Sequence, residues 1–158
     1  MIQRIQSIYL FLASVFYFSY WFFGLEWYKS GFKILENQFG EYFVINSPIL
    51  DSVLKITSYV PLLIVIFCTI VIFFYKNRNR QIFICKTSLY LSLFMSFYTL
   101  VYFFYTFEGL VAIMPTKTLE ILLYAAILNP FISSYLIYLA LKSIKNDKEL
   151  VDSLERIR

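Results

Sequence analysis

Residues 56–75 read ITSYVPLLIVIFCTIVIFFY, which is twenty residues without a charged side chain. Three further uncharged windows cover residues 5–25, 87–107 and 121–141. A helix of about 20 apolar residues spans the roughly 30 Å hydrocarbon core of a bilayer. The 158 residues are 60% hydrophobic and only 15% charged, and the mean hydropathy is +0.69. These values argue against a disordered chain or a soluble domain and predict a polytopic membrane protein.

The windows predict an all-α, four-transmembrane-helix bundle that forms one membrane domain over residues 1–158. The first helix is expected to be uncleaved, because its apolar run has full spanning length and ends in bulky aromatic residues. The short segment between the second and third helices makes these two antiparallel neighbours. The four helices are expected at about residues 3–24, 53–75, 82–107 and 118–144.

The basic residues predict the orientation of the bundle. Ten of the fourteen Lys and Arg residues fall in the N-terminal segment, the turn at 76–86 and the tail. The positive-inside rule then places both termini and the middle turn in the cytoplasm. No nucleic-acid partner is needed to explain these cations, because they border membrane spans and would face anionic lipid headgroups.

The first outer loop, at about residues 25–52, is the only sizeable segment predicted outside the membrane. Two β-prone runs, at 27–35 and 41–46, flank a polar bend that contains Gly40. This pattern predicts a small β-hairpin with its aromatic residues at the membrane interface. The second outer loop is expected to be about a dozen residues long, around Glu108 to Pro115.

The tail at 145–158 has the pattern of a short amphipathic helix, since Asn146 and Glu149 fit the spacing of a capping box. This helix either continues from the fourth span or bends off it. It either docks on a partner or the inner leaflet, or is merely the soluble end of the fourth helix. Its apolar face consists of Leu150, Val151, Leu154 and Ile157.

Three segments carry a family resemblance: MIQRIQSIYL at 1–10, FFYKNR at 73–78 with Gln81 and Cys85 following, and DKELVDSLERIR at 147–158. They resemble an uncharacterised Bacteroidota family of four-helix inner-membrane proteins, domain of unknown function 4293. The resemblance implies a fold and a location in the bacterial inner membrane. It supplies no catalytic residue.

The residue types present also restrict the chemistry. The chain has no His, and its two cysteines, Cys68 and Cys85, do not form a C-x-x-C pair. Histidine-ligated haem or metal and histidine general-base catalysis are therefore excluded, and a thiol oxidoreductase is disfavoured. The four glycines do not form a phosphate-binding loop. We expect free buried thiols, no catalytic residue, no metal and no cofactor.

Two stripes of small residues occur inside the membrane, each with the four-residue spacing that places side chains on one helix face. Small residues let helices approach closely in lipid, so we interpret both stripes as packing surfaces in the bundle interior. A polar path is the alternative. The stripes are Ser88, Ser92 and Ser96 on the third helix, and Ala125, Asn129 and Ser133 on the fourth, where Ala126, Pro130 and Ser134 lie beside them.

Asn129 lies near the middle of the fourth window, next to Pro130. Proline removes a backbone donor, and an amide at the bilayer centre needs a partner. We expect kinks at Pro61 and Pro130 and a structural role for Asn129, with a substrate or ion site at broken helices as the alternative. Coupled transport is disfavoured because no charged side chain lies at mid-depth.

Two functions remain open from the sequence. The first is a non-enzymatic accessory or scaffold subunit of a larger inner-membrane assembly, in contact with membrane lipids and protein partners. The second is a small carrier or a lipid- or quinone-binding protein with a cavity near Asn129. An enzyme is the least favoured interpretation. Stoichiometric co-purifying proteins would favour the first function, and a lone protein with bound lipid the second.

Overall fold

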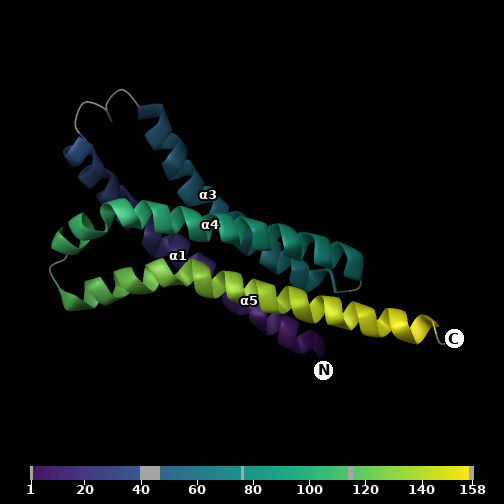
Figure 1. The fold of residues 1–158 in the computed structure, drawn as a ribbon. Helices are drawn as coiled ribbons and strands as arrows, with labels where there is room; N and C mark the ends of the chain where they lie inside the picture. Colours follow the sequence, from purple (N-terminus) through teal and green to yellow (C-terminus); the bar gives the residue numbers. More distant parts are fainter. Residues whose placement is uncertain (1, 40–46, 76, 114–115, 157–158) are drawn as a thin grey trace.

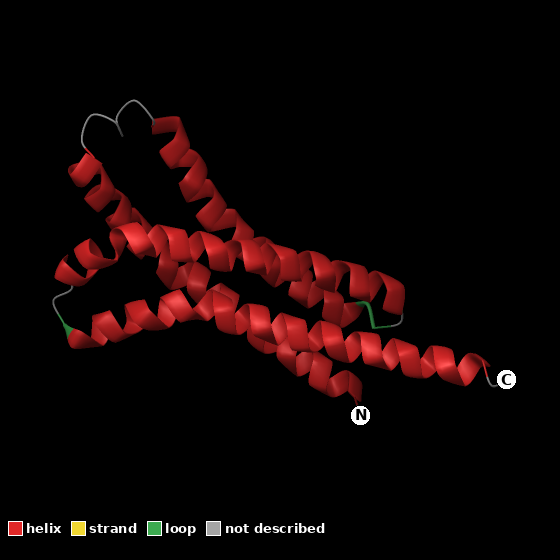
Figure 2. Cartoon of the chain, in the orientation of Figure 1, coloured by secondary structure: helices red, strands yellow, loops and turns green. Residues whose placement is uncertain are grey.

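The computed structural model describes residues 2–39, 47–75, 77–113 and 116–156. These residues form helices and no strand (Figure 2). The helices are α1 (Ile2–Phe39), α3 (Ser47–Phe73), α4 (Arg78–Ile113) and α5 (Lys117–Arg156). Each contains a stretch long and apolar enough to cross a membrane, which indicates a multi-pass membrane protein. The predicted all-α class and four spans are therefore confirmed in the described residues.

The helices form a bundle in which α1 packs against α3, α4 and α5, and α4 packs against α3 and α5. The start of α1, the end of α3, the start of α4 and the end of α5 lie together at one end of the bundle, which we call the terminal end (Figure 1). The opposite ends of the four helices form the loop end. The helices splay apart toward the loop end, where α1 and α3 diverge from α5 while α1 stays in contact with α4 (Figure 1).

The predicted β-hairpin is wrong for the residues that the structure describes. Residues 25–39 continue α1, residues 47–52 begin α3, and residues 40–46 lie outside the described part of the chain. Helix packing explains why the β-prone sequence is helical, because tertiary contacts routinely override local propensity. Tyr28 packs against Tyr102 of α4 with ring centroids 4.3 Å apart and the two rings tilted by 34°.

Glycines at two points allow α1 and α4 to approach closely beyond Tyr28. A Cβ at Gly31 would collide with the hydroxyl of Tyr102, and a Cβ at Gly109 would lie 2.6 Å from a methyl carbon of Ile34. The spacing of Tyr28, Gly31 and Ile34 places them on one helical face. The extension of α1 is therefore held against α4, which itself runs to Ile113 and leaves a much shorter second loop than predicted.

The tail is not a separate helix. Helix α5 runs without interruption from Lys117 to Arg156, so the segment beyond residue 144 continues the fourth span. Pro130 lies inside α5 and Pro61 inside α3, and both helices continue past them. Figure 1 shows α5 bent part-way along its length, and a proline within a helix is a sufficient physical cause for a bend. The kink at Pro61 stays a prediction.

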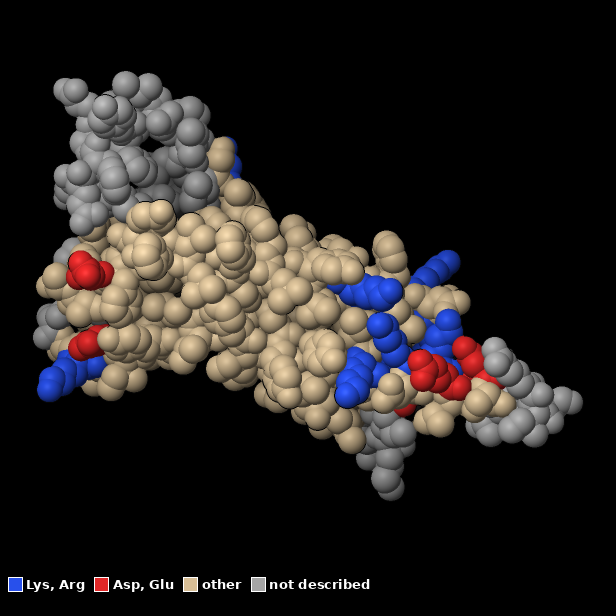
Figure 3. Space-filling model, viewed as in Figure 1, with Lys and Arg blue, Asp and Glu red and all other residues tan. Residues whose placement is uncertain are grey.

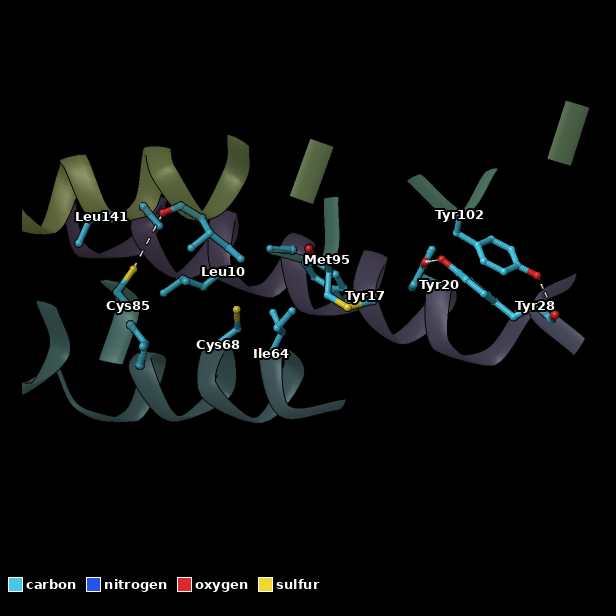
Figure 4. Close-up of a cluster of buried hydrophobic side chains, with 14 of the residues drawn as sticks. Leu10, Tyr17, Tyr20, Tyr28, Ile64, Cys68, Cys85, Met95, Tyr102 and Leu141 are labelled. Carbon is cyan, nitrogen blue, oxygen red and sulfur yellow. Dashed lines mark hydrogen bonds between the residues drawn. The ribbon is translucent and has the colours of Figure 1, made fainter. Parts of the chain in front are cut away.

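The core runs along the bundle axis as a mixture of aliphatic, aromatic and sulfur-containing side chains (Figure 4). Cys85, Cys68 and Leu10 lie toward one end, and Tyr28 and Tyr102 lie toward the other. Both cysteines are free and buried. On the visible face, Lys and Arg side chains gather over the terminal end, and the middle of the molecule is uncharged (Figure 3).

Candidate functional site: the polar interior and the groove beside Asn129

The serine stripe of α4 lies in the bundle interior. Ser88 and Ser92 are fully buried and Ser96 is 5% exposed. The Ser88 hydroxyl donates to the carbonyl oxygen of Cys85 at 2.8 Å, and the Ser96 hydroxyl donates to the carbonyl oxygen of Ser92 at 3.0 Å. These bonds satisfy hydroxyl groups within their own helix, which is how Ser is accommodated where water is absent.

The partner of this stripe on α5 is Ser134. Its hydroxyl bonds with that of Ser92 and lies 3.0 Å from that of Ser96, and it donates to the carbonyl oxygen of Pro130 at 2.7 Å. The structure therefore joins α4 and α5 through small hydroxyl side chains. The α5 residue involved is adjacent to the predicted Ser133, and this one-residue difference rotates the contact by about 100° around the helix.

The predicted α5 stripe faces α1 instead. The Asn129 amide nitrogen donates to the carbonyl oxygen of Phe16 at 3.0 Å. Ser133 donates to the backbone oxygen of Asn129 at 2.9 Å and lies 3.2 Å from its side-chain oxygen. Ala125, one turn away, is exposed. Asn129 thus bonds to the backbone of a neighbouring helix, and the structure does not bring Ala125 or Asn129 against the α4 serines.

Tyrosines of α1 extend the hydroxyl network, and the sequence analysis missed them. The Tyr17 hydroxyl donates to that of Ser92 at 2.9 Å. The Tyr20 hydroxyl bonds with that of Tyr28 and lies 3.0 Å from that of Thr99. Tyr20 and Tyr28 follow Tyr17 by 3 and 11 residues, so all three lie on one helical face. This spacing is the sequence signal that could have identified them.

Tyr28 lies beyond the apolar span Ile5–Gly24 and completes this network toward the loop end. Its backbone oxygen accepts a hydrogen bond from the Tyr102 hydroxyl at 2.8 Å (Figure 4). Burial raises the pKa of Tyr28 well above its usual range, so the side chain stays neutral as a hydrogen-bonding group. The network therefore stabilises helix contacts and supplies no group that titrates near neutral pH.

A second polar cluster closes the terminal end. The Gln6 amide donates to the carboxylate of Asp147, and the Arg78 guanidinium lies 3.8 Å from the same carboxylate oxygen. Arg78 also donates to Gln81 at 3.3 Å, and Gln81 donates to the carbonyl oxygen of Val71 at 3.2 Å. This cluster connects all four helices. Asp147, only 7% exposed, belongs to the bundle although the sequence analysis placed it in the tail.

A groove of about 470 Å³ lies between α1 and α5 in the half of the bundle near the loop end. Asn129 and Phe16 line its inner part, and Trp27 and Leu122 line its outer part. Gly24 also lines it, and a Cβ there would meet nothing nearer than Tyr20 at 4.0 Å. Most of the lining is apolar, and no lining residue is charged. The groove is suited to an uncharged, apolar ligand.

The exposed face of the tail is described only in part. Leu150 is 56% exposed and Val151 is 46% exposed. The side chains of Leu154 and Ile157 lie outside the described part of the structure. A notch of about 240 Å³ lies between the tail and the α3–α4 connection, and Arg78, Lys148, Val151 and Asp152 are among its lining residues.

The described residues contain no group of three or more His, Cys, Asp or Glu side chains placed to hold a metal ion. A family model, Domain of unknown function (DUF4293), matches residues 2–157. The chain belongs to this family. The resemblance seen in the opening, the central turn and the ending of the sequence is therefore confirmed. No curated protein and no solved structure matches the chain.

Proposed function

We propose that this DUF4293 protein is a non-enzymatic accessory or scaffold subunit of a larger assembly in the bacterial inner membrane, with both termini in the cytoplasm. The observation that carries this proposal is the apolar tail surface of Leu150 and Val151. Helix α5 has 40 residues and is about 60 Å long, roughly twice the hydrocarbon thickness of a bilayer. Its end therefore reaches into water, where the adjacent exposed side chains of Leu150 and Val151 offer an apolar surface to a partner.

A protein partner fits the tail better than the membrane surface does. An interfacial helix lies in the plane of the bilayer, but this tail continues the line of a membrane span. Residues 145–156 also contain three basic and four acidic side chains. Because this segment has no net positive charge, anionic lipid headgroups do not attract it. The notch beside Val151 carries both Arg78 and Asp152, which offers hydrogen-bonding groups of both signs to a partner.

The decisive variant is Leu150→Gln combined with Val151→Gln. This change keeps Asp147, so the cluster at the terminal end stays intact, whereas deletion of the whole tail would remove a buried residue. We expect the variant to melt like the wild type in detergent and to lose most of its stoichiometric co-purifying protein. The measurement is quantitative co-purification from membranes at matched expression.

Lys145→Gln combined with Glu149→Gln is the matched control, because both residues are exposed on the same tail and the net charge is unchanged. We expect this control to retain its partners. If the wild-type protein purifies alone, or if the Leu150 and Val151 variant retains every partner, the scaffold proposal is wrong.

The groove beside Asn129 favours a second candidate function, that of a small carrier or a lipid- or quinone-binding protein. Asn129 itself is assigned a structural role, because its amide bonds to the backbone of α1 and its oxygen atoms accept from Ser133. A lone protein with one bound lipid after purification would support this candidate over the scaffold. Loss of function in a normally folded Asn129→Leu protein would instead require a direct ligand contact at Asn129.

A further inference from the structure

The groove between α1 and α5 has the length of one leaflet. Along α1 its lining runs from Phe16 to Trp27, which are eleven positions apart and so about 17 Å apart along a helix. Half of the hydrocarbon core is about 15 Å thick. Trp27 lies at the end of the groove nearer the loop end, and tryptophan is the residue type typical of the membrane–water interface. The groove thus has the length and the end residue expected of a path from the membrane interface to the middle of the bilayer.

The chemistry of the groove excludes a headgroup from its interior. No lining residue is charged, so a phosphate or a carboxylate would be desolvated there without a partner. The amide at its inner end is partly engaged, since Asn129 donates one N–H to the carbonyl oxygen of Phe16 and its side-chain oxygen accepts from Ser133. An apolar chain needs no hydrogen-bond partner, whereas the ring carbonyls of a quinone bind more tightly where the protein donates hydrogen bonds to them.

Gly24 shows that this space is not a by-product of tight helix packing. At Gly31 and Gly109 a Cβ would collide with side chains of the facing helix, so glycine is needed for close approach. At Gly24 a Cβ would meet only ordinary contact distances, so the missing side chain widens the groove. Ala125 and Ala126 widen it from the α5 side.

We propose that this groove holds one acyl chain of a phospholipid from the leaflet at the loop end, with the lipid headgroup outside the groove beyond Trp27. The inference rests on the second candidate function and specifies its ligand. The bound chain would fill the space between α1 and α5 where the bundle splays. The lipid would therefore be a fixed part of the folded protein, distinct from the exchanging lipids around it.

The test is native mass spectrometry of the full-length protein purified in mild detergent at increasing stringency. We expect the wild type to retain one phospholipid under conditions that strip the other lipids. Gly24→Leu should fill the groove and reduce the lipid-bound fraction about tenfold, which corresponds to a modest loss of binding free energy. Ala112→Leu is the matched control, because Ala112 is exposed on α4 near the same end and does not line the groove. It should retain the lipid.

Ala125→Leu is a second filling variant from the opposite wall, and detergent melting shows whether each variant is folded. If both filling variants fold and bind phospholipid like the wild type, the inference is wrong. A quinone or a free fatty acid in place of the phospholipid overturns the inference but keeps the lipid-binding function. If the wild-type protein retains no lipid, both the inference and the lipid-binding function are wrong. None of these outcomes affects the tail experiment, which tests the scaffold separately.

Discussion

Gly31 and Gly24 lie on the same helix, yet the structure assigns them opposite roles. A Cβ at Gly31 would meet Tyr102, whose ring packs against that of Tyr28 and whose hydroxyl donates to the Tyr28 backbone oxygen. Tyr102 is only 7% exposed, so it has little room to move aside. A Cβ at Gly24 would meet only Tyr20 of its own helix, at an ordinary contact distance of 4.0 Å. The same substitution is therefore predicted to have different consequences at the two positions.

We expect Gly31→Ala to lower Tm in detergent, with an overpacking cost of about 1–3 kcal/mol. Gly24→Ala is the control, and we expect it to leave Tm unchanged or to raise it, because alanine is the better helix former by up to ~1 kcal/mol. Thermal melting of both purified variants checks the difference. Equal melting temperatures would show that α1 and α4 are not in close contact at Gly31.

Single residues also show what the sequence could indicate about the site. Asn129 and the serines stand out because polar side chains are rare inside a membrane span, and the structure gives all of them hydrogen-bond partners. Tyr17 and Tyr20 do not stand out in a chain with 14 Tyr and 18 Phe residues. Whether a tyrosine places its hydroxyl inside the bundle depends on the rotation of its helix, which only the packed structure fixes.

At the scale of the element, the α4–α5 contact depends on the small size of Ser92. Its side chain is fully buried and bonds with Ser134 and Tyr17. Replacing it with phenylalanine forces the helices apart and removes the hydroxyl group that joins Tyr17 and Ser134. Ser134 keeps its bonds to Ser96 and Pro130. Such changes in a packed interior cost about 1–3 kcal/mol or more.

We therefore expect Ser92→Phe to reduce the yield of monodisperse, folded protein much more than Phe94→Leu does. Phe94 is two residues away on the same helix and is 49% exposed, so its truncation should be tolerated. Size-exclusion profiles and melting curves at matched expression measure the effect. Similar behaviour of both variants would place Ser92 outside the interface.

Elements were predictable where hydrophobicity alone decides them and not where packing decides them. The four spans follow from uncharged windows, and the tight connection between the second and third spans follows from the polar residues at 76–81. The structure places residues 78–81 of that predicted turn in α4. The helical extension beyond Gly24 was not predictable, because charged and β-prone residues there resemble a loop. Its helix depends on contacts of Tyr28 and Gly31 with a part of α4 about 70 residues later in the chain. The predicted contact of α5 with the α4 serines was wrong by one residue, Ser133 in place of Ser134, for the same reason.

At the scale of the whole molecule, the orientation in the membrane is predicted from the ten-to-four division of Lys and Arg between the two ends. Single cysteine probes test it. A probe at Gln38 should react with an impermeant reagent added to the outer face of the membrane, and probes at Asn79 and Ser153 should not. Native Cys68 and Cys85 are buried and add little background. Labelling at Asn79 but not at Gln38 would invert the predicted topology.

The bond between Gln6 and Asp147 joins residues 141 positions apart and so sets an order of events during biosynthesis. A ribosome that adds 5–20 residues per second needs roughly 7–30 s to make the intervening chain. During that interval α1 is already synthesised while its carboxylate partner does not yet exist. The terminal end can close only as translation reaches α5. A nascent chain that stalls before α5 is made therefore lacks the Gln6–Asp147 bond, and its terminal end stays open.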